Sequence, residues 1–150
     1  GLNWKGFDFS VLLQGATRSS IYLQGDIAWD NSWGNYYEEH IGRWTPETAA
    51  TATYPRFTKA ATATHPNYYK SDYWLKDSKY LRLKNIQLGY TIPRKLLKKI
   101  GIRSLRVYTN AYNLLTWDNV KKVDPESPNN SNGQFYPQQK VINFGINLNF

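Results

Sequence analysis

The stretch VINFGINLNF, residues 141–150, decides the fold class. Apolar side chains stand at every second position, and polar or small residues fill the positions between them. The apolar positions are Ile142, Phe144, Ile146, Leu148 and Phe150. A period of two places all five on one face of an extended strand. A soluble domain seldom needs a large ring in register with four other apolar residues at its last position, so the pattern favours a strand with one face toward an apolar environment.

This last strand is predicted to run from about Gln139 to Phe150, and four more stretches are predicted to be strands. Leu2 to Gly15 alternates cleanly, and Ser20 to Trp29 alternates less cleanly. Lys79 to Ile92 and Ser104 to Leu115 follow later in the chain. Within 79–92 the apolar set changes from one face to the other, so the period alone does not identify the apolar side. The prediction is an all-β fold.

The connections between these strands alternate between very long and short. Residues 30–77 carry three prolines and no regular period, and residues 118–138 contain the turn-forming run DPESPNNSNG. Residues 93–103 are a short basic segment with apolar residues at helical spacing and Gly101 as a stop. Bacterial outer-membrane barrels have this layout, with short periplasmic turns and long outer loops. We therefore expect 30–77 and 118–138 to be extracellular loops and 93–103 to be a periplasmic turn.

The amino-acid composition excludes some classes of protein but does not select a single one. The 150 residues include 12 Tyr and 6 Trp, and aromatics make up 16%. Such amphipathic rings suit membrane interfaces, carbohydrate platforms and protein interfaces alike. The chain has no Cys, which excludes disulfides and thiolate sites within it. No apolar run reaches the roughly 20 residues of a transmembrane helix, and the N-terminus has no signal-peptide pattern.

Charge and polar clusters give no enzyme signature. The formal charge is +8, but the cations are spread out except between Arg94 and Lys99, so nucleic acid is not expected as a partner. His40 and His65 lack metal-ligand spacing, and the adjacent Glu38 and Glu39 would point to opposite faces of a strand. The oxygen-rich run 124–132 lacks the residue order of a calcium loop. We expect no catalytic residues, no metal and no cofactor.

Two architectures are compatible with the strand pattern. A membrane barrel must close on itself, and five strands are fewer than the roughly eight of the smallest barrels. On this interpretation the chain is part of a larger barrel whose earlier strands lie upstream of Gly1. The alternative is a secreted, soluble carbohydrate-binding β-domain with exposed aromatic rings.

Several longer motifs resemble one family. They are RWTPETAATATYPRF (43–57), YWLKDSKYLRLKNIQLGYTIP (73–93), SLRVYTNAYNLLTW (104–117), DPE (124–126), YPQ (136–138) and the closing VINFGINLNF. In this order they resemble the C-terminal region of TonB-dependent outer-membrane transporters of the SusC/RagA type. The resemblance covers nearly the whole chain. Short pieces such as DPE mean little alone, but the ordered series is specific.

The resemblance implies a large antiparallel transmembrane β-barrel, 22-stranded in the family, with a plug domain upstream. It implies a SusD-like surface lipoprotein as a lid, energy from the TonB complex through segments absent here, and import of oligosaccharides or peptides. The implied location is the bacterial outer membrane, with outer-membrane lipid around the barrel.

Two groups of residues are singled out as candidate contacts. Aromatic and arginine side chains of the long loop are expected to contact the lid lipoprotein or line the substrate path, although they could instead pack the loop against itself or form an interfacial belt. They are Arg43, Trp44, Tyr54, Arg56, Tyr73 and Trp74. The resemblance also implies that the last strand carries the signal for the barrel assembly machinery, with Phe150 as its key residue. The accompanying apolar residues are Leu148, Ile146 and Phe144.

Overall fold

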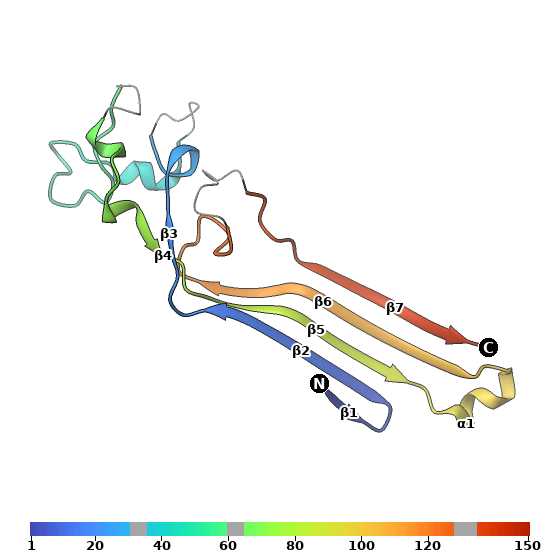
Figure 1. Ribbon diagram of the computed structural model, residues 1–150. Coiled ribbons are helices and arrows are strands. Elements are labelled where there is room, and N and C mark those ends of the chain that lie inside the picture. Colours follow the sequence, from blue (N-terminus) through green and yellow to red (C-terminus); the bar gives the residue numbers. More distant parts are fainter. Residues whose placement is uncertain (31–35, 60–64, 128–134) are drawn as a thin grey trace. The chain divides into compact units, whose positions relative to one another are not determined.

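A computed structural model describes residues 1–30, 36–59, 65–127 and 135–150. The chain divides into two compact units (Figure 1). The strand unit comprises Gly1–Arg18, Lys79–Asn119 and Pro137–Phe150. The loop unit comprises the described parts of Ser19–Ser78 and Val120–Tyr136. The predicted outer loops thus supply most of the second unit.

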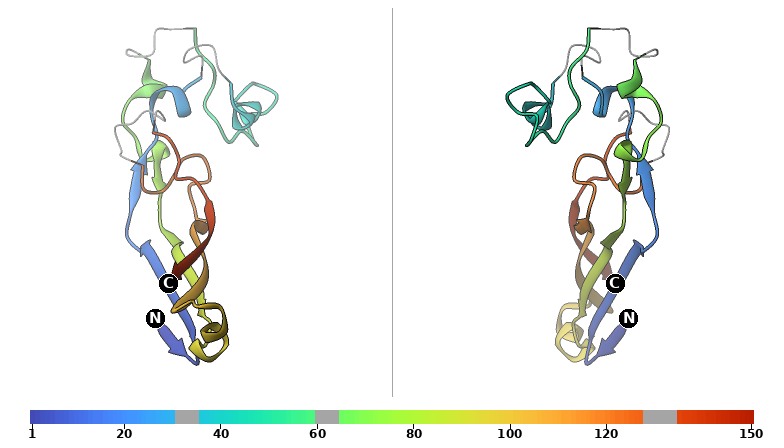
Figure 2. Two further views of the ribbon diagram at one scale, coloured as in Figure 1. Left: turned by 90° about the vertical axis from the view of Figure 1, so that its right-hand side faces the viewer. Right: turned by 90° about the vertical axis from the view of Figure 1, so that its left-hand side faces the viewer.

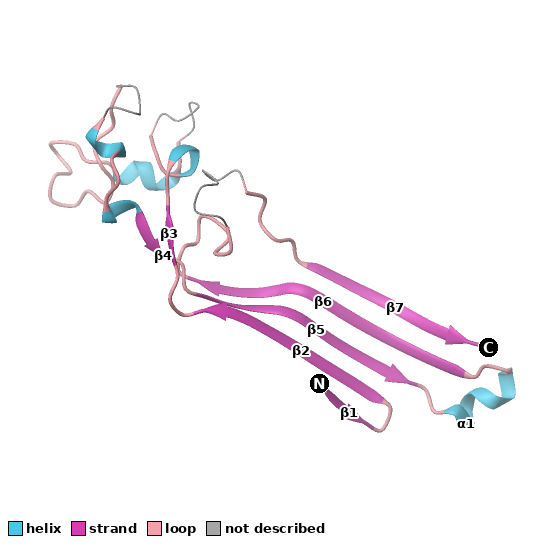
Figure 3. Cartoon of the chain, in the orientation of Figure 1, coloured by secondary structure: helices cyan, strands magenta, loops and turns pink. Residues whose placement is uncertain are grey.

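The strand unit is one antiparallel sheet with the order β1-β2-β5-β6-β7 (Figure 3). Its strands are β1 (Leu2–Trp4), β2 (Phe7–Ala16), β5 (Tyr80–Thr91), β6 (Ser104–Asp118) and β7 (Val141–Asn149). The predicted strands at 79–92, 104–115 and 139–150 are confirmed, with β6 three residues longer at its end. The sheet is a single twisted layer (Figure 2), and β1 and β7 form its edges.

The first predicted strand is in fact a hairpin. Leu2 to Gly15 is interrupted after Trp4, and β1 folds back on β2 with Trp4 opposite Phe7. The two residues between them, Lys5 and Gly6, have φ values of 46° and 91°. Positive φ at both central positions is what a type I′ hairpin turn requires. Because the first of these is Lys and not the usual Asn or Asp, the sequence pattern did not reveal the turn.

The second predicted strand, Ser20 to Trp29, is mostly wrong. Only β3 (Ser20–Tyr22) forms a strand, and it pairs with β4 (Leu75–Asp77) in a separate two-stranded sheet. Gly25 then adopts a φ of 63° and begins the 3-10 helix η1 (Gly25–Ile27). The left-handed glycine ends the extended backbone, so the weak alternation beyond it belongs to a turn.

A bulge at Lys84 explains the change of apolar face within β5. On β2, Leu12 pairs with Asn85 and Leu13 pairs with Leu83, which leaves Lys84 without a pairing position. The ladder to β6 is also irregular between Leu83 and Asn85. One extra residue shifts the following side chains by one position. The apolar residues before and after Lys84 therefore share one face of the sheet.

That face is apolar across all five strands and exposed to the surroundings. Phe144 on β7 has 83% of its surface exposed. The register places further exposed apolar side chains beside it on the same face. They include Trp4, Phe9, Val11, Leu81, Leu88, Val107, Trp117, Ile142, Ile146 and Leu148. A face of this kind needs an apolar surrounding, because water would be ordered over a large hydrophobic area.

The opposite face of the sheet is polar, and its side chains form an ion pair and hydrogen bonds with one another. Arg106 on β6 reaches across β5 to Asp8 on β2, with Nε–Oδ1 and Nη2–Oδ2 distances of 2.9 and 2.5 Å. Gly89 lies between the two strands, and a Cβ atom there would overlap both charged groups. Asn143 donates from its side-chain amide to Asn110 at 2.9 Å. The two faces therefore differ as the outside and inside of a membrane barrel do.

The short connection between β5 and β6 is helical, as predicted. It contains α1 (Arg94–Leu97) and η6 (Lys98–Ile100), and Gly101 ends it with a φ of 74°. Leu97 is buried against the strand unit. In the described part of the chain, no helix has the length and apolar character needed to span a membrane.

The loop unit is built from short elements around a small aromatic core. It contains β3, β4 and the 3-10 helices η1, η2 (Glu38–Gly42), η4 (Pro66–Tyr68) and η5 (Asp72–Trp74). Its buried cluster comprises Ile21, Leu23, Ala28, Tyr54, Trp74 and Val120. Ser19 and Ser78, at the two ends of the segment 19–78, are joined by a backbone hydrogen bond of 2.9 Å and by a hydrogen bond of 2.7 Å between their hydroxyls. The loop unit is therefore a folded body with its own core.

Candidate functional site

Two of the predicted contact residues form the interior of the loop unit. Tyr54 and Trp74 have only 5% and 3% of their surfaces exposed. The Tyr54 hydroxyl donates to the Ala28 carbonyl at 2.7 Å, and burial raises the pKa of that hydroxyl. The Trp74 indole donates to the Asn67 carbonyl at 2.8 Å. The Tyr54 hydroxyl and the Trp74 indole N–H both form hydrogen bonds within the loop unit, so these two rings stabilise the loop.

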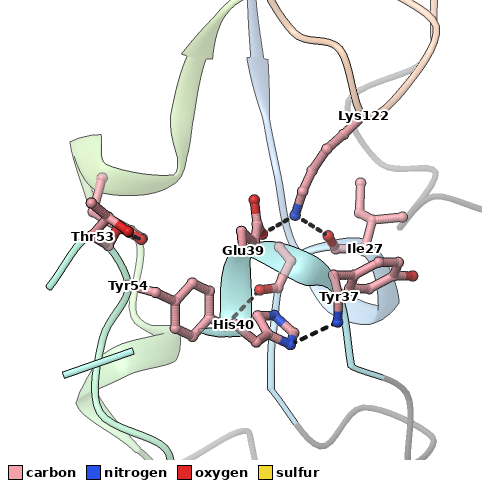
Figure 4. Close-up of polar contacts among 9 residues, drawn as sticks. Ile27, Tyr37, Glu39, His40, Thr53, Tyr54 and Lys122 are labelled. Carbon is pink, nitrogen blue, oxygen red and sulfur yellow. Dashed lines mark hydrogen bonds and ion pairs between the residues drawn. The ribbon is translucent and has the colours of Figure 1, made fainter. Parts of the chain in front are cut away.

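His40 lies at the centre of the surrounding aromatic residues. Its side chain is 2% exposed, and its ring centroid is 4.5 Å from that of Tyr54 and 5.6 Å from that of Phe57. The Nδ1 atom accepts from the Tyr37 backbone amide at 3.1 Å, which caps η2 (Figure 4). Burial lowers the pKa of His40 below its ordinary value of 6.5, although the Ala28 carbonyl and the Asp30 charge act in the opposite direction. His40 is thus a neutral, structural histidine at neutral pH.

An open cleft of about 330 Å³ lies on the outer side of His40. We call it the aromatic cleft and define it by Tyr36, Tyr37, His40, Ile41, Arg43 and Phe57. The rings of Tyr36 and Phe57 stack at 5.4 Å with an angle of 27° between them. The Arg43 guanidinium carbon lies 5.2 Å from the Phe57 ring centre. The cleft therefore combines flat apolar rings with a cation.

A second hollow of about 460 Å³ is lined in part by the same two rings. Besides Tyr36 and Phe57 it includes Asp30, whose carboxylate is buried. That carboxylate accepts from the Tyr68 hydroxyl at 2.5 Å and from the Thr58 amide at 3.0 Å. Because the carboxylate of Asp30 accepts these hydrogen bonds, it holds Thr58 in position in the wall of the hollow.

Lys122 joins the two long loops. Its ammonium group donates to the Ile27 carbonyl at 3.1 Å and forms an ion pair with Glu39 on η2 (Figure 4). Burial lowers the pKa of Lys122 to about 8. Lys122 therefore ties the second long loop to η2, which carries two residues of the aromatic cleft.

The structure divides the six predicted contact residues into two sets. Tyr54 and Trp74 are buried in the core of the loop unit, as the alternative in which these side chains pack the loop against itself expects. Arg43, Trp44, Arg56 and Tyr73 remain exposed. Of these, Arg43 enters the aromatic cleft, and the Tyr73 hydroxyl donates to the Thr53 carbonyl at 2.8 Å. Contact of any of the six with a lid or substrate stays a prediction.

Sequence reasoning missed most of the cleft. Tyr36 and Tyr37 directly precede Glu38 and Glu39, and no sequence motif marks these tyrosines or His40 as part of a binding cleft. Their clustering depends on Phe57, which lies 17 residues beyond His40. The described residues hold no group of three or more His, Asp or Glu side chains placed for a metal ion. Residues 31–35, 60–64 and 128–134 of the two long loops lie outside the described part.

The proposed assembly-signal residues all lie on the last strand or just beyond it. Phe144, Ile146, Leu148 and Phe150 are exposed, and the first three follow the apolar face of the sheet. Their role in barrel assembly stays a prediction.

The fold defines the class of protein. It is an all-β chain whose sheet is apolar on one face and polar on the other, and whose strands are joined alternately by short connections and by long loops. Strands of transmembrane β-barrels have this division of faces.

Comparisons with known proteins narrow the class to one type. No family model matches the chain. It is 30% identical to TonB-dependent receptor P26 of Formosa agariphila over 99% of its length, which is 16% of that protein. It is 24% identical to TonB-dependent receptor SusC of Bacteroides thetaiotaomicron, covering 99% of this chain and 14% of SusC.

Solved structures give the same result. The RagAB peptide importer in its open-open state matches with a TM-score of 0.75 and 27% identity, over 98% of this chain and 16% of that chain. The closed-closed state matches with a TM-score of 0.69 and 25% identity, over 97% and 16%. The resemblance to the C-terminal region of SusC/RagA-type TonB-dependent transporters is therefore confirmed. The chain spans about one sixth of the length of these relatives.

Proposed function

We propose that this chain is the C-terminal barrel segment of a TonB-dependent importer in the bacterial outer membrane. The observation that carries the proposal is the match in both sequence and structure over nearly the whole chain. The importer takes up oligosaccharides or peptides and draws its energy from the TonB complex. Its barrel strands are inserted by the barrel assembly machinery.

The loop unit is the part of the chain that contacts cargo and partner. It lies on the extracellular side, and a SusD-like lipoprotein covers it. The aromatic cleft suits flat or apolar groups, since Tyr36 and Phe57 offer ring faces and Arg43 offers a charge. Sugar rings and peptide side chains both fit that chemistry. One relative in the comparisons is a peptide importer by name.

The alternative of a secreted soluble carbohydrate-binding domain is disfavoured by the sheet. In such a domain the apolar face would be covered by a second layer. Among the described residues this face is exposed on every strand of the sheet, with Phe144 as the extreme case.

The test is affinity purification of the full-length protein from outer membranes in mild detergent, with mass spectrometry of what co-purifies. We expect a surface lipoprotein at equal stoichiometry. The double variant Trp44→Ala/Tyr73→Ala should lower its recovery several-fold, because both rings are exposed. Thr51→Ala, also exposed in the same loop, is the matched control and should leave recovery unchanged.

A second readout addresses transport. Cells carrying the protein should accumulate labelled oligosaccharides or oligopeptides, and collapse of the proton-motive force should abolish accumulation. A full-length protein that is soluble without detergent and carries no lipoprotein would overturn the proposal.

A further inference from the structure

The connection between β5 and β6 concentrates positive charge at one end of the strand unit. Five cations lie within residues 94–103, and the forty residues between Asp77 and Asp118 contain no Asp or Glu. The side chains of Arg94, Lys95, Lys98 and Lys99 are all exposed. No ion pair joins these four cations to any residue in the described part of the chain. Their charge is therefore available to an external anion.

Apolar side chains stand among these cations on the outer surface. Leu96 is 68% exposed and Ile100 is 65% exposed. They lie on either side of Lys98 and Lys99 in the helical connection. Leu97 is buried and fixes the segment to the strand unit. Exposed apolar residues beside several cations are typical of segments that lie in a membrane interface.

The apolar face of the sheet has a hollow at the same end. Its volume is about 280 Å³, and its lining includes Phe7, Leu88, Tyr90, Val107 and Phe144. Tyr90 pairs with Val107, close to where β5 ends and β6 begins. Arg94 is four residues from Tyr90, a path of at most about 14 Å. A single elongated molecule can therefore reach both the cations and the hollow.

We propose that this end of the strand unit binds an anionic glycerophospholipid. The phosphate lies against Arg94, Lys95, Lys98 and Lys99, Leu96 and Ile100 enter the interface, and one acyl chain lies along the hollow lined by Tyr90 and Phe144. Charge complementarity selects an anionic lipid over a neutral one, since basic clusters at a membrane surface attract anionic headgroups. The turn is predicted to lie on the periplasmic side of the membrane, and we therefore take a glycerophospholipid as the source of the phosphate. The inference rests on the membrane setting of the proposed function and adds a ligand to it.

The test uses the full-length protein, purified in mild detergent and exchanged into nanodiscs of phosphatidylethanolamine with a defined fraction of phosphatidylglycerol. Native mass spectrometry then counts retained lipids. We expect phosphatidylglycerol to be retained at least threefold above its share of the bilayer. Lys98→Gln/Lys99→Gln should reduce that enrichment by more than half.

Two controls keep the outcome specific. Lys59→Gln/Lys70→Gln removes the same charge from exposed positions in the loop unit and should retain the enrichment. Val107→Trp fills the hollow without changing charge and should also reduce retention. Heat-modifiable mobility on gels shows that each variant is folded.

Three results would overturn the proposal. They are retention of both lipids in proportion to the bilayer, equal loss in the loop-unit control, and preferential retention of lipid A when it is offered in competition. The co-purified lipoprotein is measured in the same preparations. Its presence without lipid enrichment would refute the lipid site alone, and its absence would count against the importer.

Discussion

At the scale of single residues, Gly89 shows how the polar face of the sheet is organised. The Asp8–Arg106 ion pair bridges two strands that are not neighbours, and the residues are 98 positions apart. The bridge crosses β5 at the one position that lacks a side chain. Glycine ordinarily weakens a strand, so its presence here has a spatial reason.

Substitution of this glycine tests that reason. Gly89→Ala should destabilise the folded sheet by about 1–3 kcal/mol, the usual cost of overpacking, because the new methyl group overlaps both charged side chains. The measurement is the temperature at which the full-length protein loses its heat-modifiable mobility. In an Asp8→Ala/Arg106→Ala background the same substitution should cost little. An equal loss in both backgrounds would show that the ion pair is not what needs the space.

At the scale of elements, the bulge in β5 keeps the apolar face continuous. A regular strand would place Leu83 and Ile86, three positions apart, on opposite faces. The extra residue at Lys84 brings both to the apolar face, where they pair with Leu13 and Val11 of β2. Without it, half of β5 would turn its polar side chains outward.

Cysteine labelling measures this arrangement, because the chain contains no native Cys. Single variants Leu83→Cys and Ile86→Cys are made in a full-length background with upstream cysteines replaced. In a bilayer both should resist a charged thiol reagent and react with a lipophilic one. Gln87→Cys, on the polar face, should react with the charged reagent. If Leu83→Cys instead behaved like Gln87→Cys, the strand would be regular in the membrane.

At the scale of the whole molecule, the chain has two units with separate interiors. The strand unit relies on backbone pairing, whereas the loop unit relies on a buried aromatic core against which His40 packs. A change that charges this core should therefore act on the loop unit first.

Acidification provides such a change. The pKa of His40 is lowered in the folded state, so the unfolded loop takes up the proton first as the pH falls below about 6.5. The histidine contribution to stability is thus complete above that pH and is lost as the pH falls toward the lowered pKa. Protonation of Nδ1 also removes the acceptor for the Tyr37 amide.

We expect limited proteolysis of residues 36–57 in the full-length protein to accelerate between pH 7.5 and pH 5, while the sheet keeps its heat-modifiable mobility. His40→Gln, whose side-chain oxygen can still accept from Tyr37, should be insensitive over this range. His65→Gln is the matched control and should respond as the unaltered protein does. An unchanged pH response in His40→Gln would assign the effect to another group.

The sequence by itself determined the all-β class, the three long strands after residue 79 and the helical turn that ends at Gly101. It also carried the family resemblance. These features are local, since a period of two, a helical spacing and a stop glycine are written in neighbouring residues.

Only the tertiary structure decided the rest. The Lys5–Gly6 hairpin, the departure of Ser20–Trp29 from the main sheet and the bulge at Lys84 depend on which strands pair. The burial of Tyr54 depends on a bond to Ala28, 26 positions away, and the aromatic cleft depends on Phe57 folding back onto η2. Such contacts join residues that are distant in the sequence. Their free energy is gained only when the whole unit has folded, so no local sequence pattern predicts them.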